Sequence, residues 1–70
     1  MDYVVTTNTG AKYWAGTLKN AQDMAKVYLQ DWLAVGNTKP KTEVWHNPTG
    51  KLLSVGEIID DKIEISNWIE

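Results

Sequence analysis

The stretch Thr17–Gly36, TLKNAQDMAKVYLQDWLAVG, decides the fold. Its apolar residues recur three or four positions apart, which is the pattern of an amphipathic helix with one buried face. They are Leu18, Ala21, Met24, Ala25, Tyr28, Leu29, Trp32 and Leu33. Thr17 is suited to cap the amino end of the helix, and Gly36 to end it in a left-handed conformation. We therefore predict a helix over residues 18–35 whose apolar stripe, Trp32 included, packs into the core.

Short segments rich in β-branched and aromatic residues flank this helix on both sides and predict strands. These segments are residues 3–7, 11–15, 42–46, 51–59 and 62–69. Turn-forming residues separate them at 8–10, 47–50 and 60–61, and Gly56 inside the fourth segment predicts a bulge. The order ββαβββ predicts one α+β domain over residues 1–70. Its antiparallel sheet has about five strands, and the single helix packs on one face.

Composition and charge exclude several classes of protein. The chain is 43% hydrophobic, contains no cysteine or arginine, and has a net charge of −2. A disulfide framework and a thiolate metal site are excluded, and nucleic-acid binding is disfavoured because such domains are usually basic. No apolar run reaches the roughly 18 residues that a membrane span needs, and residues 1–7 lack the features of a signal peptide. We expect a soluble, cytoplasmic domain that has no contact with a membrane.

Few side chains in the sequence could take part in catalysis or bind a metal ion. His46 is the only histidine, so a metal site would lack convergent nitrogen ligands. The adjacent acids Asp60 and Asp61 are typical of a solvated turn, and the glycines form neither a phosphate-binding loop nor a dinucleotide fingerprint. We therefore expect no enzyme activity, no catalytic or metal-binding residues and no cofactor.

Three tryptophans are the informative feature, because strand alternation places each of them on the more polar side of its segment. Trp14 shares a side with Lys12, Trp45 with Glu43, and Trp68 with Glu64. One interpretation is that these rings only stabilise the sheet through cross-strand pairs. The other is that Trp14, Trp45 and Trp68, together with Glu43 and Glu64, form a protein-binding surface on the sheet face opposite the helix.

The layout also resembles that of known small domains. A Gly16–Thr17 entry leads into a helix carrying Ala21 and Ala25, and a later strand ends in a turn before Gly50–Leu52. Over about residues 3–53 this is similar to small uncharacterised bacterial and phage domains, including small phage-encoded inhibitors of host defence. The resemblance implies an inhibitor or adaptor and brings no catalytic residue to this chain.

These observations predict a non-enzymatic interaction module that binds a protein partner or a second copy of itself, as a homodimer, through its aromatic sheet face. A first alternative is a single-stranded nucleic-acid-binding domain in which bases stack on the same rings. A second is an uncharacterised structural domain without a binding partner.

Overall fold

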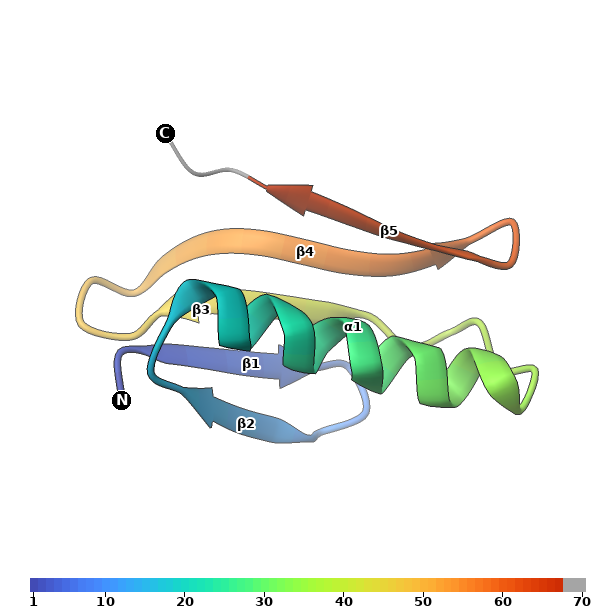
Figure 1. Cartoon of the computed structure of the whole chain (residues 1–70), viewed down its shortest axis with the longest axis horizontal. Helices are drawn as coiled ribbons and strands as arrows, with labels where there is room; N and C mark the ends of the chain where they lie inside the picture. Colours follow the sequence, from blue (N-terminus) through green and yellow to red (C-terminus); the bar gives the residue numbers. More distant parts are fainter. Residues whose placement is uncertain (68–70) are drawn as a thin grey trace.

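A computed structural model, described here for residues 1–67, has a helix lying across one face of a five-stranded antiparallel sheet (Figure 1). The elements in chain order are β1 (Tyr3–Thr7), β2 (Lys12–Ala15), α1 (Leu18–Ala34), β3 (Thr42–His46), β4 (Lys51–Ile59) and β5 (Lys62–Asn67). The predicted α+β class and the ββαβββ order are confirmed. None of the helices within residues 1–67 is long and apolar enough to cross a membrane.

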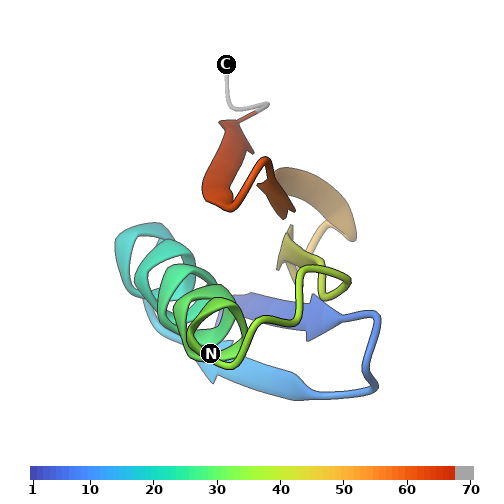
Figure 2. The same cartoon turned by 90° about the vertical axis from the view of Figure 1, so that its right-hand side faces the viewer.

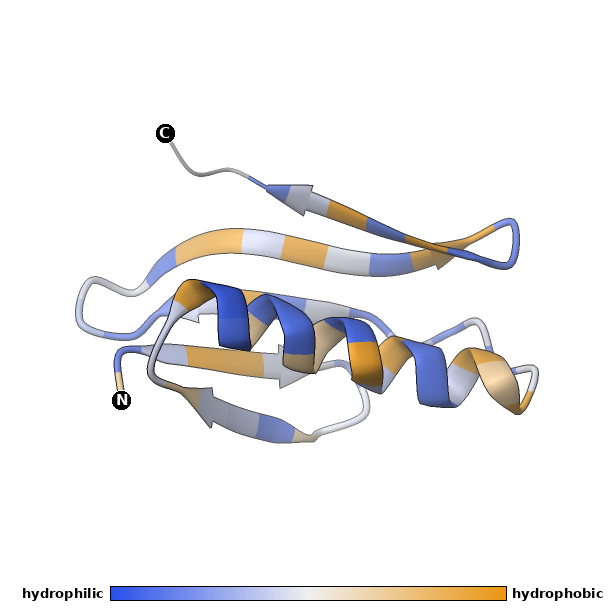
Figure 3. Ribbon diagram, viewed as in Figure 1, coloured by the Kyte–Doolittle hydropathy of each residue, from blue (hydrophilic) through white to orange (hydrophobic). Residues whose placement is uncertain are grey.

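The strands are ordered β2-β1-β3-β4-β5 across the sheet, so β1 lies between β2 and β3. The chain therefore leaves the first hairpin from the edge strand β2 and forms α1. It then returns as β3, which pairs with the other side of β1. β2 and β5 form the two edges, and the sheet twists strongly between them (Figure 2). Polar and apolar residues alternate along β5, as expected for a strand with two different environments, whereas β4 contains adjacent apolar residues (Figure 3).

The helix is capped as its sequence predicts. The backbone N–H of Asn20 donates to the Thr17 hydroxyl at 3.1 Å, and Gly36 follows the helix with φ +79°. The core between α1 and the sheet contains Val5, Ala15, Ala21, Ala25, Leu29 and Val44. Small alanines at 21 and 25 let the helix backbone approach the strands closely. The prediction that Trp32 lies in the core is wrong in degree, because its ring is only half-buried and packs beside Tyr28 at 6.4 Å between ring centroids.

The predicted bulge at Gly56 is wrong in position. The register between β3 and β4 shifts where Trp45 pairs with Leu52 and Val44 pairs with Ser54, so Leu53 is the extra residue. Gly56 instead allows close packing. A Cβ at this position would stand 2.9 Å from Leu29 Cδ1 and would also collide with the Thr42 hydroxyl. The glycine therefore leaves space for the helix to approach the middle of β4.

The β4–β5 hairpin turns through two residues, Asp60 and Asp61, because Ile59 pairs directly with Lys62. Both aspartates have positive φ, at 52° and 61°. Two consecutive left-handed residues are what a type I′ hairpin requires, since this turn matches the twist of the strands. The turn thus sets the register of the edge strand β5.

Candidate functional site

The sheet face opposite α1 is organised in rows that run across the strands, because residues paired between neighbouring strands point to the same side. The first row contains Trp14, Val4, Trp45 and Leu52. Its neighbours in the sequence, Val5 and Val44, lie in the core under the helix, so this row faces away from α1. Within residues 1–67 no helix or strand covers this face.

The two tryptophans of this row differ in how they are held. Trp45 is half-buried, and its indole Nε1 donates a hydrogen bond to the Thr6 hydroxyl at 3.0 Å. Trp14 lies on the edge strand β2 and is 45% exposed. Val4 lies between the two rings and is only 7% exposed, although it points away from the core. The row therefore combines the hydrogen-bonded ring of Trp45, the exposed ring of Trp14 and the aliphatic side chain of Val4 between them.

Acidic side chains follow the aromatic row along the strands. The next row contains Lys12, Thr6, Glu43, Val55 and Ser66. Beyond it, Glu57 and Glu64 lie directly opposite each other on β4 and β5. Lys41 Nζ lies 3.4 Å from Glu57 and partly offsets this pair of like charges. Glu43 thus lies in the row next to the apolar row, and Glu57 and Glu64 lie one row further, on a face that also carries Lys12 and Lys41.

Four of the five residues predicted to form the protein-binding surface lie within residues 1–67. Trp14, Trp45, Glu43 and Glu64 all lie on the sheet face opposite the helix, as the strand alternation predicted. Trp68 lies outside the described residues. Glu64 is separated from the aromatic row by the intervening row that contains Val55, so the four predicted residues within 1–67 do not form one tight cluster.

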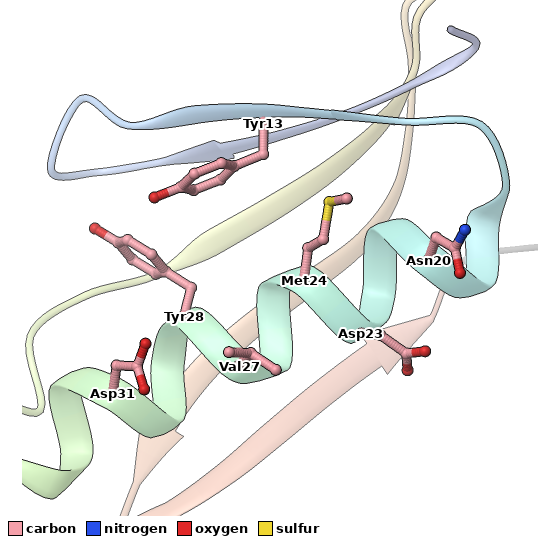
Figure 4. A pocket seen from close by; sticks show the side chains of 7 residues that line it. All are labelled: Tyr13, Asn20, Asp23, Met24, Val27, Tyr28 and Asp31. Atoms are coloured by element: carbon pink, nitrogen blue, oxygen red, sulfur yellow. The ribbon is translucent and has the colours of Figure 1, made fainter.

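A second surface escaped the sequence analysis. A groove of about 450 Å³ lies between β2 and the outer side of α1, lined by Tyr13, Asn20, Asp23, Met24, Val27, Tyr28 and Asp31 (Figure 4). Met24 belongs to the helix stripe that was predicted to pack into the core, but it is 39% exposed, and Tyr13 on β2 is 42% exposed. The signal that could have revealed the groove is Val27, because an apolar residue outside the main stripe widens the apolar arc of the helix beyond one buried face.

One wall of the groove is fixed by the ring of Tyr28. It stands 6.0 Å from the Tyr13 ring, and its hydroxyl is hydrogen-bonded to the Thr9 hydroxyl in the β1–β2 loop. Burial raises the pKa of Tyr28, but hydrogen bonding, above all with Thr9, outweighs it and leaves the pKa below its ordinary value. These contacts tie the first hairpin to the helix.

The arrangement of polar groups offers little chemistry. His46 is half-buried, its ring packs against Tyr3 at 5.4 Å, and its Nδ1 is hydrogen-bonded to the Thr49 hydroxyl at 2.8 Å. Among residues 1–67 no three histidine or carboxylate side chains gather in a way that could hold a metal ion.

Comparisons of the chain with protein-family models, curated proteins and solved structures found no match.

Proposed function

We propose that this chain is a non-enzymatic interaction module that binds a protein partner through the sheet face opposite α1. The observation that supports this proposal best is the row Trp14–Val4–Trp45, which lies on a face that no described element covers. Aromatic side chains of this kind are enriched among the residues that contribute most to binding at protein interfaces. An indole that is already held in place, such as that of Trp45, loses little conformational freedom when a partner docks.

The charge beside this row supports a protein partner over a nucleic acid. Glu43, Glu57 and Glu64 are matched in number by Lys12, Lys41 and Lys62 on the same face, so a phosphate backbone would find no excess of positive charge there. A partner with apolar side chains on the aromatic row and a lysine or arginine opposite Glu43 would complement both parts of the surface. We propose such a cytoplasmic protein as the partner. An inhibitor or adaptor similar to the small phage proteins would need no more than this surface.

The test uses the whole chain as an immobilised bait and compares the wild type with two surface variants. Trp14→Ser removes the exposed ring, and Glu64→Lys reverses a charge on the same face. Val35→Ser is the matched control, because Val35 is also exposed and apolar but lies at the end of the helix. We expect a specific protein whose dissociation constant rises about 30-fold for Trp14→Ser, since loss of such an anchor costs about 2 kcal/mol.

Equal melting temperatures of the variants are required, so that weaker binding is not the result of unfolding. The proposal fails if every retained protein binds all variants equally. It also fails if the wild type retains only single-stranded nucleic acid in a strongly salt-dependent manner, which would favour base stacking on the same rings.

A further inference from the structure

The outer edge of β2 presents unpaired backbone groups. Thr7 N–H donates to the Ala11 carbonyl at 3.1 Å, and hydrogen-bonded pairs alternate along an antiparallel ladder. Tyr13 and Ala15 therefore turn their N–H and C=O groups toward β1, whereas those of Lys12 and Trp14 point away from the sheet. No other described strand pairs with this edge. It contains no proline, so both positions can donate and accept hydrogen bonds.

Exposed apolar side chains concentrate beside this edge on both faces of the sheet. Tyr13, Met24 and Val27 line the groove on the helix side, and Val27 is 54% exposed. Trp14 is exposed on the other side of the same strand. In Figure 4 the Tyr13 ring points toward α1 above Met24 and Tyr28. A strand added next to β2 would direct its own side chains on this face into the same groove, because paired residues share a side.

We propose that the occupant is a second copy of this chain, which pairs its own β2 antiparallel to the first about a two-fold axis at Tyr13. In a continuous sheet each residue must face one that points to the same side, and the outward backbone groups belong to positions 12 and 14. Both conditions are met when Lys12 of one copy pairs with Trp14 of the other. Tyr13 then lies opposite Tyr13 of the second copy on the axis.

Complementarity of the side chains favours a second copy over an unrelated strand. On the face away from the helix, Lys12 of each copy lies over the exposed Trp14 ring of the other, where its stem covers the indole and its ammonium group meets the ring face. On the helix side, the second Tyr13 ring enters the groove beside Met24 and Val27. Both contacts occur twice through the two-fold symmetry. The dimer covers Trp14 and leaves Trp45 uncovered, and this proposal does not depend on the open sheet face being a partner site.

The test measures the mass of the full chain by light scattering and sedimentation at protein concentrations up to about 1 mM, which detects weak association. The wild type is expected to reach twice the chain mass of 7.9 kDa. Tyr13→Glu and Tyr13→Lys should each weaken dimerisation at least about tenfold, because like charges then face each other on the axis. An equimolar mixture of the two variants should recover the dimer, since the opposed charges become complementary.

Met24→Glu provides a second variant in case substitution of Tyr13 disturbs its packing on Tyr28, and it should also weaken the dimer. Val35→Glu, at the far end of the helix, should leave the dimer intact. A wild type that stays monomeric throughout the concentration range overturns the proposal. So does a dimer that folded Tyr13 and Met24 variants retain. A dimer lost only in a Trp45→Ser variant would assign association to the open sheet face and overturn pairing through β2.

Discussion

Replacement of Gly56 by alanine tests how closely α1 packs on the sheet. A Cβ at this position would stand 2.9 Å from Leu29 Cδ1 and 3.0 Å from Ile65 Cδ1, and would also collide with the Thr42 hydroxyl. Leu29 and Thr42 are completely buried, so neither can move into solvent. The added methyl group is thus confined by α1, β3 and β5 at the same time.

Two effects of opposite sign set the magnitude for Gly56→Ala. Replacing glycine by alanine restricts the unfolded chain and stabilises the folded state by about 0.4–1 kcal/mol where the site accepts a Cβ. Overpacking a filled core costs about 1–3 kcal/mol. The structure shows three obstructing neighbours, so we expect the cost to win and the free energy of unfolding to fall by about 1–2 kcal/mol. For a domain of this size the melting temperature falls about 4–8 °C for each kcal/mol.

Chemical denaturation followed by tryptophan fluorescence measures this change. Gly16→Ala is the matched control, because a Cβ there meets nothing within 4 Å. It should leave stability unchanged or raise it slightly. Adding Thr42→Ala to Gly56→Ala removes one obstructing atom. The two substitutions should therefore destabilise less together than the sum of their separate effects, by about 0.5 kcal/mol or more. If Gly56→Ala is as stable as the wild type, the close packing described here is refuted.

Two further substitutions test the buried hydroxyl of Thr42 and the turn between β4 and β5. The Thr42 hydroxyl is buried and has no hydrogen-bond partner among residues 1–67, so Thr42→Val should raise the denaturant midpoint by removing an unsatisfied group worth about 1 kcal/mol or more. A lower midpoint would show that the hydroxyl does have a partner. Asp61 holds φ +61° in the β4–β5 turn, and Asp61→Gly should stabilise the hairpin by about 0.5–1 kcal/mol because glycine enters this region without strain. Calorimetry measures the effect, and a lower melting temperature would contradict the turn geometry.

Local sequence patterns were sufficient for the elements themselves. The strands at Tyr3–Thr7, Thr42–His46 and Lys51–Ile59 have the bounds that their composition predicted, and the helix ends within one residue of its prediction. These segments obey short-range rules, because side-chain alternation, capping by Thr17 and left-handed glycines act over a few residues. For the same reason the side of the sheet that Trp14 and Trp45 occupy followed from alternation alone.

Longer-range features were decided only by the tertiary structure. The position of β1 between β2 and β3 depends on pairing between segments far apart in the sequence, which no local pattern encodes. The helical period identified an apolar arc that included Met24, but how much of that arc is covered depends on where the helix lies relative to the sheet edge. Gly56 illustrates the same limit. A glycine inside a strand segment suggests a bulge. Gly56 instead allows close packing against Leu29 and Ile65, which meet it only when helix and sheet are packed together.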